Sequence, residues 1–324
     1  MAQTRARADR GGWVRRLVAG IFIPLLLLPA HAAAQPEAVE PLPVVEVAPG
    51  VFVHQAPYAL ALPRNLGFVG NAGFIIGDDA VAVVDTGGSL KAGERLKAAI
   101  AAHTSLPVRY VINTHMHPDH VLGNAAFAGP GVTFIGHHNL PQALRARAES
   151  YLEATRRLVG PDGAEGTRVV LPDQTVSDSL TVDLGHRPLL LEAWPTAHTA
   201  TDLTVFDGAT DTWFLGDLLF LGHVPAIDGK ALGWISLLEQ LKARPAARVV
   251  PGHGPAQQPW PAAAAPTERY LRRLVADVRG MVRDGRSMDE AARQAGRAEA
   301  ADWALFDDFN ARNATATFHE LEWE

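Results

Sequence analysis

The residues best suited to chemistry in this chain form one short run of histidines and an aspartate. The run reads Thr114-His115-Met116-His117-Pro118-Asp119-His120 and places four potential metal ligands within six residues. At the end of a strand, alternation of side chains lets His115 and His117 point to one side. Asp119 and His120 would lie at the turn into a short helix and reach a second position nearby. Such a cluster suits two metal ions better than one.

Three further candidate ligands occur later in the chain, each just beyond a predicted strand. They are His198 after a strand over 188–194, Asp217 after the apolar run 213–216, and His253 after the run 249–252. Loops at the ends of rigid strands are where proteins commonly build functional sites. The other histidines, apart from His223, are interpreted as surface or hydrogen-bonded side chains.

The composition narrows the chemistry that these residues can perform. The 324 residues include no cysteine, which excludes disulfides, thiolate nucleophiles, iron–sulfur clusters and cysteine zinc sites. Any metal must therefore be held by histidine, aspartate or glutamate. A formal net charge of −6 argues against a general nucleic-acid binder. The length and the 48% apolar content fit one large globular domain or two modest ones.

The N-terminal residues 1–34 have the layout of a secretory signal peptide. Five arginines precede an apolar segment over 17–29, and small residues follow in the pattern Ala30-His31-Ala32-Ala33-Ala34. The apolar segment is shorter than the roughly 20 residues that span a bilayer, which favours cleavage over a membrane anchor. We expect a periplasmic or secreted bacterial protein with no membrane span after signal removal. Arg15-Arg16 leaves twin-arginine export open as an alternative.

The remaining chain predicts the elements that must position the candidate ligands. After a mobile leader over 35–43, short β-branched runs predict two batches of strands, each closing with a helix–strand unit. The first batch has a helix over 89–102 and a strand over 108–112. The second has strands at 168–171, 175–183, 188–194, 203–207 and 212–215 and a helix over 231–242. Helices are predicted over 141–158 and 267–282, and Ser287-x-x-Glu290 is a capping box.

Taken together, the seven ligand candidates resemble the metal site of the metallo-β-lactamase-fold hydrolases. That resemblance implies an α/β fold, a four-layer αββα sandwich over 44–260, followed by a C-terminal helical extension over 261–324. By the same resemblance, His115, His117 and His198 would bind the first zinc ion. Asp119, His120 and His253 would bind the second. Asp217 would bridge the two.

A finer resemblance is to the exported quinoprotein relay system zinc metallohydrolases. It rests on Ala48-Pro49-Gly50-Val51-Phe52-Val53-His54-Gln55, on Asn113 to His120, on Gly222-His223-Val224-Pro225 and on Glu320-Leu321-Glu322. These relatives imply a periplasmic quinone-dependent dehydrogenase as partner. The aspartate at position 217 makes the chain similar to the glyoxalase II, lactonase and phosphodiesterase branches of the family. This similarity makes β-lactam hydrolysis a less favoured activity. The short spacing of His198, Asp217 and His253 leaves no room for the inserted domain of the nuclease members.

The expected function is therefore an exported hydrolase with two zinc ions that acts on a small ester, thioester, lactone or amide. Zinc lowers the pKa of a bridging water from about 15.7 to near 7, which supplies hydroxide as the nucleophile. Asp119 would bind metal and orient the proton of that hydroxide. His223 is a candidate substrate contact, and the apolar loop 56–68 could cover the site or pack on the core. Two alternatives stay open, namely an iron-dependent persulfide dioxygenase and a non-catalytic metal-loaded partner of a periplasmic dehydrogenase.

Overall fold

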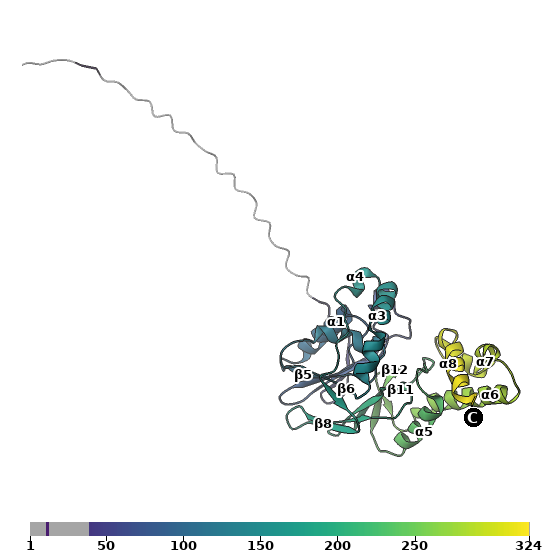
Figure 1. The fold of residues 1–324 in the computed structure, drawn as a ribbon. Coiled ribbons are helices and arrows are strands. Elements are labelled where there is room, and N and C mark those ends of the chain that lie inside the picture. Colours follow the sequence, from purple (N-terminus) through teal and green to yellow (C-terminus); the bar gives the residue numbers. More distant parts are fainter. Residues whose placement is uncertain (1–10, 13–38, 324) are drawn as a thin grey trace, which may run out of the picture. The chain divides into compact units, whose positions relative to one another are not determined.

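Two mixed β-sheets form the centre of the fold in the computed structural model, which describes residues 11–12 and 39–323 (Figure 1). Apart from Gly11 and Gly12, the predicted signal peptide and the start of the predicted leader lie outside the described residues. Val39–Glu324 form one compact unit. Within the described part of the chain, no helix is long and apolar enough to cross a membrane.

The first sheet has seven strands that are neighbours in the order in which they occur in the chain. Its first four strands pair antiparallel, and the pairs from the fourth to the seventh are parallel. The strands are β1 (Val45–Ala48), β2 (Val51–His54), β3 (Ala72–Ile76), β4 (Val81–Val84), β5 (Val108–Ile112), β6 (Thr133–His137) and β7 (Gln174–Val176).

The second sheet has six strands in the order β13-β12-β11-β10-β9-β8. Only its β11–β12 pair is parallel. The strands are β8 (Ser179–Asp183), β9 (Pro188–Ala193), β10 (Leu203–Asp207), β11 (Thr212–Phe220), β12 (Arg248–His253) and β13 (Gln258–Pro259).

Alternating apolar residues explain why the two sheets stack face to face. In β4, Ala82 and Val84 belong to the core between the sheets, whereas Val81 and Val83 belong to the core under the helices of the first sheet. Phe214 of β11 lies in the core between the sheets, and its neighbour Trp213 points to the opposite face. Successive side chains of a strand point to opposite faces of its sheet, so these apolar strands bury both faces of each sheet.

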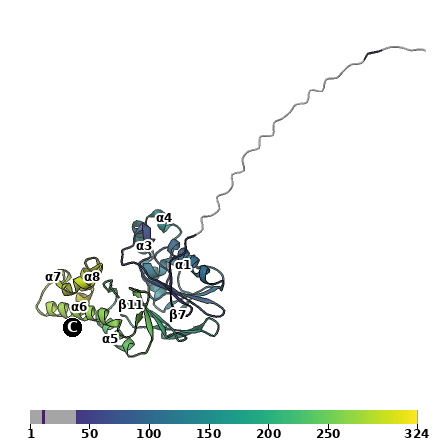
Figure 2. The same ribbon diagram turned by 180° about the vertical axis from the view of Figure 1, so that it is seen from behind.

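Helices cover the outer faces and complete the four layers. Helix α1 packs on the first sheet through Leu96 and Ile100, and α5 packs on the second through Trp234 and Leu238. Figures 1 and 2 show α1, α3 and α4 toward one side of the sheets and α5 to α8 toward the other. The helices are α1 (Leu90–His103), α2 (Pro118–Val121), α3 (Leu140–Val159), α4 (Pro161–Ala164), α5 (Ala231–Lys242), α6 (Ala264–Arg283), α7 (Met288–Gln294) and α8 (Phe306–Leu321), with 3₁₀ turns η1 (Pro63–Asn65), η2 (Leu122–Ala126) and η3 (Arg297–Asp302).

The αββα fold with C-terminal helices agrees with the sequence prediction, and three local predictions are wrong. Residues 168–171 form no strand, although Val169, Val170 and Leu171 are apolar. The strand expected over 175–183 is two strands, β7 and β8, which lie in different sheets. The leader expected to be mobile over 35–43 is held in its described part, because Leu42 is buried and its N–H donates to the carbonyl of Arg95.

The C-terminal helices contact the segment that links β11 to α5. The buried amide of Asn313 in α8 accepts a hydrogen bond from the Ile227 N–H (2.9 Å) and donates to the Pro225 carbonyl (2.5 Å). Glu320 of the same helix accepts from the Ala231 N–H at 2.7 Å. Helix α8 therefore fixes the backbone of 225–231, a segment that also borders the candidate ligands.

Replacing Asn313 should destabilise the protein because its partners would be left buried without hydrogen bonds. We expect Asn313→Ala to lower the free energy of unfolding by about 2–4 kcal/mol. Thr315→Ala on the same helix is the control, since its hydroxyl bonds only to the Ala311 carbonyl within the helix. That control should change stability by about 0.5 kcal/mol or less. Urea titration measures both, and equal midpoints for the two variants would contradict the role of Asn313.

Candidate metal centre

Five segments of the chain bring the seven predicted ligands to one place. The loop after β5 supplies His115 and His117, and the first turn of α2 supplies Asp119 and His120. His198 lies in the loop after β9, and His253 is the last residue of β12. Asp217 lies inside β11, which continues to Phe220, so the prediction that it follows the strand is wrong.

The ligand atoms fall into two groups, each able to hold a metal ion. His115, His117, His198 and Asp217 form the first group, and Asp119, His120 and His253 form the second. Within each group the ligand atoms lie within 4.8 Å of one another. Five of the seven side chains are 6% exposed or less, whereas His117 is 16% exposed and Asp119 is 20% exposed. The five histidines and Asp119 that the resemblance assigned to one ion or the other divide in the same way, whereas Asp217, which it assigned to both ions, is grouped here with the first.

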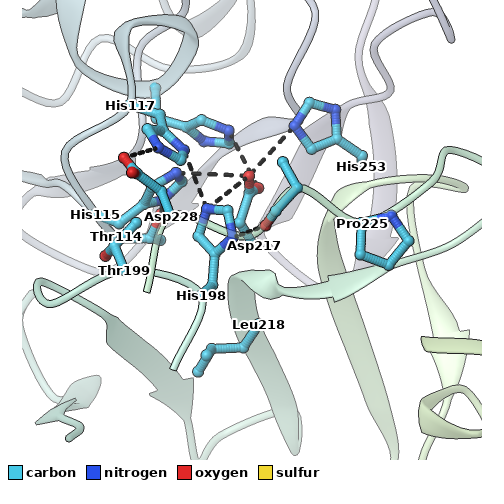
Figure 3. A network of polar contacts seen from close by, with 12 residues as sticks. Thr114, His115, His117, His198, Thr199, Asp217, Leu218, Pro225, Asp228 and His253 are labelled. Carbon is cyan, nitrogen blue, oxygen red and sulfur yellow. Dashed lines mark hydrogen bonds and ion pairs between the residues drawn. The ribbon is translucent and has the colours of Figure 1, made fainter. Parts of the chain in front are cut away.

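The carboxylate of Asp217 contacts both groups (Figure 3). Its Oδ2 lies 3.5 Å from His115 Nε2 and 3.3 Å from His198 Nε2 in the first group. In the second group, His120 Nε2 lies 3.2 Å from Oδ1, and His253 Nε2 lies 3.4 Å from Oδ2. A carboxylate in this position can supply one oxygen to each of two metal ions.

Unsatisfied polar atoms show that these residues fit a pair of metal ions. His115 Nε2, His120 Nε2 and Asp217 Oδ1 are buried and make no hydrogen bond of suitable geometry among the described residues, although the last two atoms lie 3.2 Å apart. A buried polar atom without a partner costs about 1–3 kcal/mol, so proteins rarely leave three of them together. All three belong to the two ligand groups. Imidazole and carboxylate suit zinc, and they also suit other divalent metals.

Comparison with known proteins identifies the family to which this arrangement belongs. A sequence model described as the metallo-β-lactamase superfamily matches residues 66–253, more than half of the chain. The chain belongs to the metallo-β-lactamase superfamily. It is a metal-dependent hydrolase of that superfamily with a histidine and aspartate metal site. No curated protein gives a significant match.

Solved structures of the superfamily show the same fold at low sequence identity. A metallo-β-lactamase from Pontibacter korlensis is 20% identical over 71% of this chain and 99% of its own, with a TM-score of 0.57. The protein TMB-1 is 18% identical over 72% of this chain and 98% of its own, with a TM-score of 0.54. The inverting sec-alkylsulfatase Pisa1 from Pseudomonas sp. is 14% identical with a TM-score of 0.64. That match covers 86% of this chain and half of Pisa1.

Hydrogen bonds from the outer ring nitrogens turn the histidines of this metallohydrolase toward the centre. His198 Nδ1 donates to the Ala226 carbonyl at 2.7 Å, which leaves Nε2 as the ligand atom. His117 contacts Asp228 through Nε2 at 3.1 Å, so its Nδ1 faces the first group. Partners of this kind fix the tautomer of a ligand and raise its basicity.

The sequence analysis missed Asp85, which performs this role for the second group. Asp85 Oδ2 lies 2.8 Å from His120 Nδ1, and the same carboxylate accepts hydrogen bonds from the N–H and hydroxyl of Thr114. It follows β4 directly and has a left-handed backbone, with φ of 59°. The sequence feature that could have identified Asp85 is its position directly after the apolar run Val81–Val84. Asp228 was also missed, because nothing near it in the sequence indicates a contact with His117.

Two glycines leave the space that the bridging aspartate occupies. A Cβ atom on Gly252 would lie 1.9 Å from Asp217 Oδ1. One on Gly216 would lie 2.6 Å from Thr114 Cβ, and Gly216 also has a positive φ of 53°. The β11–β12 register is irregular on both sides of Gly216. Asp217 can therefore sit inside a strand and still reach the ligands of the other sheet.

Burial and neighbouring carboxylates give the two groups different proton affinities before a metal binds. Burial lowers the pKa of His115 well below its usual value and lowers that of His198 to about 3. Burial acts on His253 in the same direction, but Asp217 and Asp119 outweigh it and raise the pKa of His253 to about 9. The pKa of His120 is raised for the same reason.

A pocket of about 350 Å³ opens beside the two ligand groups. Asp119, Asp217 and His253 line it, and so does His223. His223 is buried and packs against His253, with ring centroids 4.8 Å apart and the rings tilted by 37°. Its Nδ1 donates to the Val224 carbonyl, and burial lowers its pKa to about 4, so neutral Nε2 can accept a hydrogen bond. Its predicted contact with substrate stays a prediction.

The loop expected over 56–68 forms part of the same pocket. Ala59, Leu60, Ala61 and Gly67 line it. The loop is also tied to the core of the domain, because the Ala56 N–H donates to Asn71 and Phe68 is buried. It therefore serves both as a wall of the pocket and as a packed connection between β2 and β3.

Acid should remove metal from the second group before the first. A metal ion must displace the protons that Asp217 and Asp119 stabilise on His253 and His120, and their release becomes about tenfold less favourable for each unit that the pH falls. His115 and His198, whose pKa values are lowered, carry no such protons near neutral pH. We expect dialysis at about pH 5.5 to release close to one metal equivalent while the other is retained. Elemental analysis checks this, and loss of both metals in one step would contradict it.

Removing the charge of Asp85 should weaken metal binding at the second group. In Asp85→Asn, an amide N–H would face His120 Nδ1–H or a Thr114 donor, and the orientation of His120 would be lost. The metal affinity of that group should fall about 10–100-fold in titrations against a competing chelator. Asp207→Asn is the matched control, since this buried carboxylate pairs with Arg187 instead. Wild-type affinity in Asp85→Asn would refute this role.

Proposed function

We propose that this protein is an exported dinuclear zinc hydrolase that cleaves a small ester, thioester, lactone or amide. The observation that carries the proposal is the Asp217 carboxylate shared between two ligand groups at a pocket of small-molecule size. Bound divalent ions supply a deprotonated water as nucleophile and polarise the bond under attack. No serine or cysteine nucleophile is then needed.

The side chains around the pocket have separate tasks in this proposal. Asp119 is the only one of the seven ligands that combines a carboxylate with a fifth of its side chain exposed, so it can orient the attacking water and take up its proton. Its Oδ2 is held 3.4 Å from His253 Nε2. Neutral His223 can accept a hydrogen bond from the substrate or the leaving group. Apolar walls exclude bulk water from the reacting bond.

Export and partnership are part of the same proposal. The basic, apolar and small segments of 1–34 support export to the bacterial periplasm. The motifs shared with the quinoprotein relay system metallohydrolases support an association with a periplasmic quinone-dependent dehydrogenase. A small molecule, not a nucleic acid, is the proposed substrate. Mass spectrometry of the protein from its native compartment should find cleavage near Ala32 or Ala34, and a retained N-terminus on soluble protein would contradict export.

Metal analysis followed by a substrate panel tests the reaction. We expect about two zinc ions per chain at neutral pH and turnover of at least one ester, thioester, lactone or amide. The panel includes a β-lactam and a secondary alkyl sulfate, because the superfamily structures similar to this chain include enzymes named for those activities. A single iron per chain with persulfide oxidation would instead support the dioxygenase alternative. Two bound metals with no turnover of any substrate would support a non-catalytic partner.

Substitution of Asp217 tests the bridge on which the dinuclear proposal depends. Asp217→Ala should bind about one zinc ion tightly, because three imidazoles remain in the first group, and should lose activity by two or more orders of magnitude. The zinc affinity and activity of Asp217→Asn should lie between those of the wild type and Asp217→Ala, since an amide can bind one metal ion but bridges two poorly. His253→Ala is the matched comparison, because it weakens the second group and keeps the bridge. Two tight zinc ions and near-native turnover in Asp217→Ala would show that the carboxylate is structural.

A further inference from the structure

Helix α8 places one cationic side chain in the wall of the pocket. Phe309 and Arg312 are three residues apart on one face of the helix, and both line the pocket. Arg312 is the only lysine or arginine among the described lining residues. It lies outside residues 66–253, so the match to the superfamily assigns it no role.

The contacts of Arg312 leave positive charge available in the pocket. Its Nη2 lies 3.3 Å from Asp228 Oδ1, and its side chain is 63% exposed. The same carboxylate contacts Arg147 of α3 at 3.5 Å and His117 at 3.1 Å. One carboxylate thus faces two guanidinium groups, and one unit of positive charge is not neutralised. Of the two arginines, only Arg312 lines the pocket.

Most of the other residues that line the pocket are apolar. They include Leu60, Ala61, Val69, Leu158, Val159 and Phe309. Leu60 is 43% exposed and Leu158 is 45% exposed, which places them among the few large apolar side chains that the described chain leaves in contact with solvent. A bound molecule with an apolar portion would cover them and stabilise the complex.

We propose that Arg312 binds an anionic group of the substrate, and that the substrate is an amphipathic anion. Its carboxylate or equivalent oxyanion would pair with the guanidinium, and its apolar portion would lie between Leu60 and Leu158. Only Asp228 separates Arg312 from the ligand His117, so the anionic group lies close to the bond that is cleaved. This inference rests on the proposed function, whose substrate classes it restricts to members that carry a negative charge.

A purely structural role for Arg312 makes a different prediction. If the side chain only holds Asp228 against His117, Arg147 and Arg312 are equivalent, because both pair with the same carboxylate. If Arg312 binds the substrate, Arg147→Gln leaves anion binding intact and Arg312→Gln does not. Arg147→Gln is therefore the matched control, and Arg312→Lys tests whether the positive charge alone is sufficient.

Calorimetric titration of the metal-loaded protein with octane-1-sulfonate tests the proposal without turnover. A sulfonate pairs with a guanidinium and is a weak metal ligand, and the octyl chain matches the apolar walls. We expect the dissociation constant to rise about five- to tenfold in Arg312→Gln, to rise less in Arg312→Lys and to stay unchanged in Arg147→Gln. Wild-type binding should weaken with added salt. The neutral ligand 1-octanol should bind all four proteins equally.

Three results on sulfonate binding would overturn the proposal. They are the absence of sulfonate binding to the wild type, an unchanged dissociation constant in Arg312→Gln, and an equal rise in Arg147→Gln. If Arg312→Gln weakened the binding of 1-octanol as much as that of the sulfonate, the proposal would also be overturned, because the pocket itself would then have changed shape. Failure of the proposed hydrolase activity is distinguishable, since it would leave these binding constants as expected while the substrate panel shows no turnover.

Discussion

The buried carboxylate of Asp217 lies among four imidazole rings, and the arrangement of the rest of the structure depends on that contact. A buried ionised carboxylate is costly unless positive or polar groups surround it closely. Imidazoles from both ligand groups do so within 3.5 Å, and they come from four separate segments of the chain. Each segment must therefore be fixed on a rigid support. The outer partners of the rings, such as Asp85 and the Ala226 carbonyl, supply that support locally.

The strand topology explains why these segments meet at one edge of the sandwich. Asp85 and His115 follow β4 and β5, which are parallel neighbours in the first sheet. Asp217 and His253 lie toward the ends of β11 and β12, the parallel pair of the second sheet. Carboxyl ends of parallel strands open on the same side, where loops can converge on a ligand. The antiparallel strands of each sheet contribute to the core between the sheets.

The sequence was informative where the chemistry is local and weak where partners are distant. Metal-ligand types concentrated within 115–120 indicated the site, and periodic apolar residues indicated most strands and helices. Val169, Val170 and Leu171 are apolar because they pack, half-buried, against two apolar clusters, and their backbone pairs with no strand. Asp217 was expected beyond its strand because Gly216 resembles a strand end, whereas its positive φ bends β11 without ending it. Asp228 and Arg312 could not be paired in advance, since 84 residues separate them along the chain and only the fold brings them to 3.3 Å.

The C-terminal helices belong to the site as much as to the scaffold. Asn313 holds the backbone beside Ala226, whose carbonyl orients the ligand His198. Phe309 packs against His223, which in turn packs against the ligand His253. One helix outside the matched superfamily region thus reaches the first ligand group through the backbone of 225–227 and the second through His223, and the same helix supplies part of the pocket wall. A shared metal centre can serve many reactions, so the substrate is selected by what surrounds it. In this protein, we expect that selection to fall largely to α8, α3, the loop between β2 and β3 and the segment after β11 that carries His223, because these elements line the pocket and supply no metal ligand.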